Sequence, residues 1–208
     1  MTLRSRSYLL ALAAACALSA CDGGPDDPGP VAAGLNFTYA GARSGEHRSG
    51  GTPSLTQAGV PSFGAWAMAN ADSVGGVMLA GFDPTTSPEG NFFILQLRPA
   101  GTGSFDCAAG GQGGCHGRFI VGVDTGDLTA APEGWYEVVD GSVDIAEATA
   151  TRLVGSFEAT LVDAETNDTI HVADGTIDVP FSASPNLSDG INCWARNVQN
   201  GTNQPCGN

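Results

Sequence analysis

The chain has 208 residues, of which 22 are acidic and only eight are basic, so its formal net charge is −14 at pH 7. Beyond residue 20 it carries six arginines, no lysine and all 22 acids, a formal charge of −16. So acidic a chain is, as a whole, repelled by nucleic acid and by anionic lipid headgroups, so nucleic-acid binding is not expected. The acids are scattered, as on an ordinary solvated surface.

Residues 1–20 have the pattern of a secretory signal peptide. Two arginines precede an apolar run from Tyr8 to Leu18 of roughly a dozen residues, which is too short to cross a bilayer. Leu18-Ser19-Ala20-Cys21 then resembles the bacterial lipobox. We therefore expect an exported lipoprotein that is anchored to the cell envelope by acylation of Cys21. The alternative is an ordinary secretory signal that leaves Cys21 as a thiol or disulfide partner.

Residues 21–34 are predicted to form a flexible tether. The segment from Asp22 to Pro30 contains proline, glycine and aspartate, with no apolar side chain that could pack. The expected partner of this end of the chain is the lipid bilayer, through acylated Cys21. Asp22 resembles the inner-membrane retention signal of enterobacterial lipoproteins, but that rule varies between bacterial groups, so the choice between inner and outer membrane stays open.

Residues 35–184 are predicted to form one all-β domain, an antiparallel sandwich or barrel-like fold of about 8–11 strands. Side chains alternate between apolar and polar over Leu153–Val162 and Thr176–Phe181, where Pro180 indicates an edge or a strand end. Phe92–Leu97 is apolar on both faces, which predicts a central strand covered on both sides. Further strands are expected at 35–40, 62–70, 74–82, 91–98, 118–123, 135–139, 142–149 and 169–173.

Two similar segments begin with Asp140-Gly141 and Asp174-Gly175, which are expected to be tight turns or strand entries. They predict two strands that begin alike and pair across the sheet. Their carboxylates are weak candidates for calcium ligands, against the simpler interpretation of solvated turn aspartates. The candidate residues are Asp140, Asp144, Asp174 and Asp178.

The four cysteines outside residues 1–21 are an even number in a chain expected to be exported, which predicts disulfides. We favour the pairs Cys107–Cys115 and Cys193–Cys206 among the three possible pairings. The second pair would staple the otherwise structureless tail 185–208. A c-type haem site is disfavoured because seven residues separate Cys107 from Cys115, and zinc would need further ligands at no recognisable spacing, so no cofactor is expected.

Three segments carry a resemblance to a known group of proteins. Phe37-Thr38-Tyr39-Ala40-Gly41, Gly155-Ser156-Phe157-Glu158-Ala159-Thr160 and Asp174-Gly175-Thr176-Ile177-Asp178-Val179-Pro180-Phe181 resemble recurring segments of a loose family of uncharacterised bacterial all-β lipoproteins. The resemblance spans most of residues 35–183. It implies an all-β domain and no established activity, so it transfers no functional residue.

Motifs for common chemistries are absent from the sequence. It contains neither Gly-x-Ser-x-Gly nor His-Glu-x-x-His, and the glycine-rich run 110–114 lacks the lysine of a phosphate loop. The imidazoles are His47, His116 and His171, and Glu46 and His47 are neighbours that would point to opposite faces of a strand. Catalysis by these histidines is therefore not expected.

The tryptophans offer another kind of site, an aromatic platform for sugar or peptide. Trp66 alternates with apolar residues and is expected in the core, and Trp135-Tyr136 must turn one ring outward. Trp194 is the better candidate for exposure, but packing of the tail onto the sandwich is favoured over ligand binding there. We expect a non-enzymatic envelope, binding or adhesion module that acts through its loops; a carbohydrate or a protein is a possible ligand, and the sequence does not identify it. The competing hypothesis is a hydrolase or lyase of envelope polymers that uses two carboxylates about 5–9 Å apart.

Overall fold

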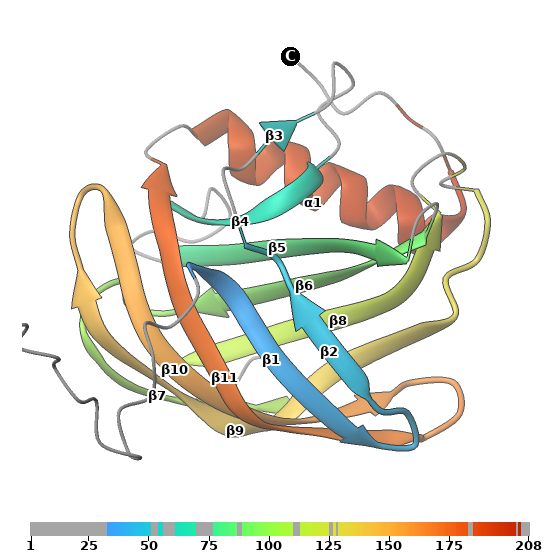
Figure 1. Cartoon of the computed structure of the whole chain (residues 1–208), viewed down its shortest axis with the longest axis horizontal. Coiled ribbons are helices and arrows are strands. Elements are labelled where there is room, and N and C mark those ends of the chain that lie inside the picture. Colours follow the sequence, from blue (N-terminus) through green and yellow to red (C-terminus); the bar gives the residue numbers. More distant parts are fainter. Residues whose placement is uncertain are drawn as a thin grey trace, which may run out of the picture. The chain divides into compact units, whose positions relative to one another are not determined.

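Figure 1 presents the computed structural model, which divides into two units, residues 1–30 and 31–208. The described residues belong to the second unit, and they form eleven strands and one helix. The predicted signal peptide and Cys21 lie outside them. The described residues are 33–50, 54–55, 61–69, 77–86, 89–109, 113–124, 127, 129–182, 185–202 and 204.

The strands account for most of these residues, and the helix comes last. In chain order the elements are β1 (Gly34–Gly41), β2 (Gly45–Arg48), β3 (Ser54–Leu55), β4 (Pro61–Ala69), β5 (Val77–Thr86), β6 (Glu89–Leu97), β7 (Gly103–Ala108), β8 (Cys115–Asp124), β9 (Gly134–Ala148), β10 (Arg152–Asp163), β11 (Thr169–Ser182) and α1 (Pro185–Asn200).

One sheet contains all of the strands in the order β2-β1-β11-β10-β9-β7-β8-β6-β5-β4-β3. Its neighbours are antiparallel except for two short parallel contacts, β7 with β8 and β11 with β4. In the second of these, Phe181 at the end of β11 pairs with Ala67 of β4, so the sheet curls back toward itself. The result is a nearly closed barrel (Figure 1), which confirms the predicted all-β, barrel-like fold.

The interior of the barrel is filled by side chains. Phe37 contacts the rings of Phe93, Phe119 and Phe157 edge-on, at centroid distances of 5.0, 5.2 and 5.6 Å. Aliphatic side chains from the other strands surround these rings and are almost entirely buried. The interior is therefore a packed hydrophobic core of the kind that small barrels build from alternate residues of each strand.

A second, smaller core lies outside the barrel, between the sheet and α1. Phe92 and Ile94 point away from the barrel interior and pack in one cluster with Ala195 and Val198 of the helix. Phe93, Leu95 and Leu97 belong to the interior core. The prediction that Phe92–Leu97 is covered on both sides is thus confirmed, and Figure 1 shows α1 lying along the outside of the sheet.

The helix corrects the expectation that the tail lacks regular structure. Residues 185–200 are helical because Ala195 and Val198, three positions apart, lie on the same helix face and cover apolar side chains of β5, β6 and β8. The other end of the predicted staple, Cys206, lies outside the described residues, whereas Cys193 is disulfide-bonded.

The two Asp-Gly pairs also differ from expectation, because each lies within one long strand, β9 or β11, and not at a strand start. Gly141 pairs with Ala159 of β10, and Gly175 pairs with Phe157. Gly141 has φ 136°, and a Cβ on Gly175 would overlap the Phe157 ring. The glycines let β9 and β11 bend on either side of β10, which separates them, so the two segments do not pair with each other.

Candidate functional site

The outer face of β6 and β8 carries polar side chains beside the helix. Gln96 pairs with His116 across these strands, and two residues further Ile94 pairs with Arg118. Because the intervening Leu95 is in the barrel core, the side chains of Gln96, His116 and Arg118 point outward. These side chains form a polar floor next to the apolar area under α1.

Two other elements border this floor. On one side α1 contributes Asn192, Arg196 and Gln199, which the spacing of four and three residues places on one helix face. On the other side lie Arg98 and the backbone of Gly114, whose carbonyl accepts a 2.7 Å hydrogen bond from the Arg98 N–H. The floor and its borders thus come from three separate parts of the chain.

Two adjoining hollows of about 410 Å³ each occupy this region, and both are lined by His116, Gly117 and Arg118. One extends toward Arg98 and Glu137, and the other extends toward α1. We call them together the basic groove, because its charged residues are mainly cationic. The basic groove is defined by Gln96, Arg98, His116, Arg118, Glu137, Asn192, Arg196 and Gln199.

Positive charge is concentrated in this groove although the chain as a whole is strongly acidic. Three of the six arginines beyond residue 20 lie here. Within the described part of the chain, Arg98 and Arg196 have no ion-pair partner, whereas Arg118 lies 3.3 Å from a carboxylate oxygen of Glu137. The Arg118 guanidinium also lies 5.7 Å from the centre of the Trp135 ring.

His116 is half-buried in the groove, and its pKa is lowered from the usual value. Burial is the main cause, the positive charges of Arg118 and Arg98 lower the pKa further, and Glu137 acts in the opposite direction. Burial and the two arginines thus both favour the neutral imidazole, and the arginines also attract anions. A bound anion would offset both arginine charges and raise the pKa of His116 again.

A third hollow of about 490 Å³ lies beside Trp135 and contains several carboxylates. Asp163 accepts backbone N–H bonds from Trp135, Glu165 and Thr166 at 2.9–3.1 Å. Burial opposes its ionisation, but these hydrogen bonds outweigh burial and lower the pKa of Asp163. Glu133 and Glu137 pair with arginines. The lowered pKa of Asp163 is the opposite of what a general acid needs, so this hollow does not favour the hypothesis of paired catalytic carboxylates.

The four candidate calcium ligands are not brought together. Asp140 and Asp144 lie on β9 and Asp174 and Asp178 lie on β11, with β10 between these strands. Asp144 accepts a hydrogen bond from Ser104, and Asp174 accepts two from Thr38. Among the described side chains, no group of three or more histidines, cysteines or acids is arranged to hold a metal ion.

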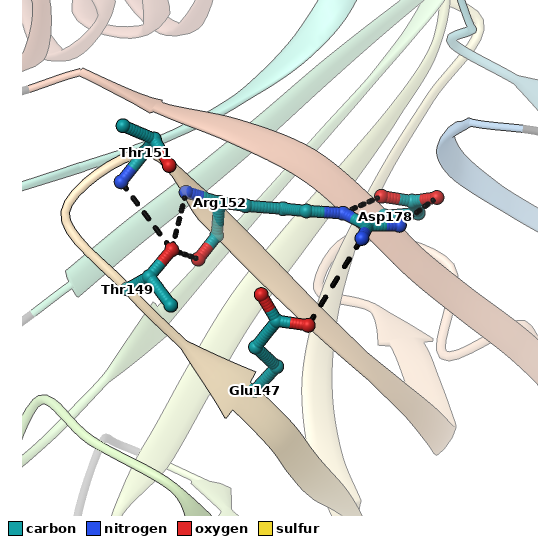
Figure 2. Close-up of polar contacts among 5 residues, drawn as sticks. All are labelled: Glu147, Thr149, Thr151, Arg152 and Asp178. Atoms are coloured by element: carbon teal, nitrogen blue, oxygen red, sulfur yellow. Dashed lines mark hydrogen bonds and ion pairs between the residues drawn. The ribbon is translucent and has the colours of Figure 1, made fainter.

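Asp178 is held by an arginine, as Figure 2 shows. The Arg152 guanidinium donates two hydrogen bonds of 2.8 and 2.9 Å to the two carboxylate oxygens of Asp178, and it lies 4.0 Å from Glu147. The hydrogen bonds from Arg152 lower the pKa of Asp178. Thr149 orders the preceding turn, because its hydroxyl accepts the Arg152 N–H at 3.0 Å. This contact joins β9, β10 and β11, so it stabilises the fold.

The three histidines lie in three different environments. His47 is fully buried in the barrel, whereas Glu46 beside it points to solvent, as the alternation predicts. His171 is exposed on β11 and lies 3.2 Å from the Thr160 hydroxyl. His116 alone lies in the basic groove. The structure therefore does not assemble them into one catalytic site.

The predicted disulfide between Cys107 and Cys115 is present, and it links the end of β7 to the start of β8 beside the groove. Tyr136 is buried in the interior, and Trp135 packs on the outer face against the cluster under α1, so one ring of this pair turns outward as predicted. The side chains of Trp66 and Trp194 lie outside the described part of the structure.

Sequence reasoning missed the basic groove. Arg98, Arg118 and Arg196 are far apart in the chain, and the only sequence signal was the scarcity of positive charge itself. No family model, curated protein or solved structure matches this chain. Within the described residues, no helix has the length and hydrophobicity to span a membrane.

Proposed function

We propose that the protein is an exported, lipid-anchored binding module of the bacterial cell envelope and that its ligand occupies the basic groove. The observation that carries this proposal is the clustering of Arg98, Arg118 and Arg196 in an acidic chain. Like charges that gather at one place, against their mutual repulsion, favour a site for a ligand of opposite charge.

The packing of the barrel supports an outer site. In barrels that carry small ligands the interior is hollow, but here Phe37, Phe93, Phe119 and Phe157 fill it. The groove, in contrast, is bordered by two hydrogen-bonded strands, a helix and a disulfide-linked segment. Elements of this kind hold side chains in place before the ligand arrives, which reduces the entropy lost on binding.

Two features of the sequence support the location. The lipobox-like segment ends at Cys21, and the following residues have the composition of a tether. The Cys107–Cys115 disulfide is typical of an oxidising compartment outside the cytoplasm. Acyl chains on Cys21 would keep the protein at a membrane, since each buried methylene contributes about 0.8 kcal/mol.

Mass spectrometry of the protein from its native host tests the location. We expect an N-terminal peptide that begins at Cys21 and carries acyl chains, and we expect a Cys21→Ser variant to leave the membrane fraction. An intact N-terminus at Met1, or an unmodified sulfur on Cys21, would refute the lipid anchor.

Binding through the groove is tested separately with the full chain, purified from membranes in a mild detergent. Glycans extracted from the host envelope are titrated against the wild type and against a variant with Arg118→Gln and Arg196→Gln. We expect saturable binding that the double variant weakens. The matched control is Arg48→Gln, which removes one positive charge from an exposed arginine paired with Glu46. Equal binding by all three proteins would refute a role for the groove.

A further inference from the structure

We infer that the ligand of the basic groove is an acidic oligosaccharide whose carboxylates pair with Arg98, Arg118 and Arg196 and whose hydroxyls bond to the neighbouring amide side chains. This inference rests on the proposed function, because it names the ligand class of the same groove. It is argued from the charge, the polar lining and the strand pairing of the groove.

The charges identify the ligand as an anion with several charged groups. A guanidinium matches a carboxylate in shape and can donate two parallel hydrogen bonds to it. Arg98 follows β6, Arg118 is in β8 and Arg196 is in α1, so the three cations are distributed along two adjoining hollows. Charges spread over both hollows fit a chain of acidic units better than one small anion.

The uncharged lining suits a sugar. Gln96, Asn192 and Gln199 carry amides that both donate and accept hydrogen bonds, as hydroxyl groups require. Few apolar side chains line the two hollows, namely Ile94, Val138 and Ala195. A groove that offers amides and guanidinium groups, with little apolar surface, matches the polar and densely hydroxylated surface of a saccharide.

The strand pairing disfavours a peptide ligand. An extended peptide usually binds by adding a strand to a free sheet edge, where its backbone can form hydrogen bonds. β6 pairs with β5 on one edge and β8 on the other, and β8 pairs with β6 and β9. The β6 side of the floor thus has no free edge, and the far side of β8 is paired at Cys115 and again over Arg118–Val121, so only a short stretch between them is open. The few apolar side chains offer no pockets for peptide side chains.

His116 makes binding depend on pH. The charged or titratable groups that face it are Arg98, Arg118 and Glu137, and α1 adds Arg196 to the same hollow. An anion that contacts the two arginines favours the imidazolium form of His116, so binding is coupled to uptake of a proton. Affinity for the acidic oligosaccharide therefore rises as the pH falls through the titration range of His116.

The test uses the full chain in detergent and isothermal titration calorimetry with three probes: a hexamer of galacturonate, a neutral hexamer of glucose, and inorganic phosphate. We expect binding of the galacturonate hexamer that weakens as the salt concentration rises. Each of the substitutions Arg98→Gln, Arg118→Gln and Arg196→Gln should weaken it about 3- to 10-fold, the size of one partly exposed charge pair. Arg48→Gln should change it less than about twofold. Unfolding curves of each variant verify that the fold is retained.

The other outcomes overturn the inference in distinguishable ways. Equal binding of the neutral hexamer would refute the anionic ligand but would leave a saccharide-binding groove. Phosphate binding as tight as that of the galacturonate hexamer would refute the oligosaccharide in favour of a small anion. If no probe binds, the inference is wrong. The envelope-glycan experiment then decides separately on the proposed function. The proposed function fails as well if those glycans bind the wild type and the double arginine variant equally.

Discussion

His47 in the barrel core and His116 in the basic groove are two histidines with lowered pKa values, but for different reasons. His47 is 0% exposed, stacks on Phe37 at 4.8 Å and lies edge-on to Phe119. Within the described residues neither of its ring nitrogens has a hydrogen-bond partner. Burial lowers its pKa to about 4, although the charge of Asp83 acts in the opposite direction. For His116, neighbouring arginines add to the effect of burial.

The two lowered pKa values have different consequences: that of His47 affects the stability of the fold, and that of His116 affects ligand binding. The neutral state of His47 is imposed by the apolar core, so its protonation works against the folded state. The neutral state of His116 is imposed partly by cations that an incoming anion would neutralise. A lowered imidazole pKa therefore indicates a binding site only where the surroundings are charged and accessible.

The largest expected effect comes from deleting a ring of the core around His47. Phe119→Ala should lower the free energy of unfolding by about 3–5 kcal/mol, because it removes a fully buried ring and leaves a cavity. Arg118→Gln on the neighbouring outward position should cost less than about 1 kcal/mol. Denaturant unfolding measures the free energy of unfolding of both variants. Similar losses in the two would contradict the conclusion that Phe119 belongs to the core and Arg118 to the groove.

The second effect is the pH dependence that His47 imposes. Its folded-state pKa of about 4 lies below the usual 6.5 of the unfolded chain, so the unfolded state binds more protons between these values. Stability should be complete above about pH 6.5 and fall by up to about 3 kcal/mol as the pH drops to 4.

A His47→Phe variant tests this dependence, because it keeps an aromatic ring and removes the titrating group. The difference in unfolding free energy between pH 7 and pH 4 should shrink by about the same amount, up to ~3 kcal/mol. His171→Asn, at an exposed position, is the control and should follow the wild-type curve. If the unfolding free energies of the wild type and His47→Phe change with pH in parallel, His47 is not the source of the pH dependence.

The disulfide provides the third test, since it lies where the core meets the groove. Replacing Cys107 and Cys115 together by alanine should cost about 2 kcal/mol, from the entropy that the closed loop removes from the unfolded chain. Because Gly114 and Arg98 are hydrogen-bonded beside this link, binding of the galacturonate hexamer should weaken as well. If stability falls and affinity does not change, the disulfide serves the core alone.

The smallest effect concerns His116. Because the pKa of His116 is lowered by burial and by Arg118 and Arg98, the affinity of the wild type for the galacturonate hexamer should be higher at pH 5.5 than at pH 7.5, and His116→Asn should abolish most of this rise. The unfolding free energy of His116→Asn should change by less than about 0.5 kcal/mol, as is usual for a polar substitution at a partly exposed position. Calorimetry at pH 7.5 and pH 5.5 measures these affinities. If the affinity of the variant changes with pH as much as that of the wild type, His116 is not the group that couples binding to pH.

Alternation of apolar and polar residues predicted the longer strands well. Leu153, Phe157 and Leu161 point into the core as predicted. β2 and β7 were not predicted although exposed and buried residues alternate in both, because strands of four and six residues give too few repeats of the pattern. In β9 and β11 the Asp-Gly pairs suggested turns, but hydrogen bonding to β10 keeps both strands continuous through a bend.

The helix was missed although three signals in the sequence indicated it. Pro185 stands at its first position, where a proline loses no hydrogen bond, and Gly201 follows its end with φ 58°. Apolar residues also recur at the spacing of one helix face, a pattern that the prediction of a structureless tail did not use; they are Leu187, Ile191, Ala195 and Val198. The uncovered outer face of β5, β6 and β8, which the helix packs against, exists only once the sheet has formed.

By itself, the sequence determined the strand-built core, the Cys107–Cys115 link and the acidic surface, since these follow from local alternation, short loops and composition. Only the tertiary structure decided where the few cations lie. Arg98, Arg118 and Arg196 meet because β6 pairs with β8 and α1 packs across both. Such contacts depend on long-range register and packing, which no local pattern in the chain encodes.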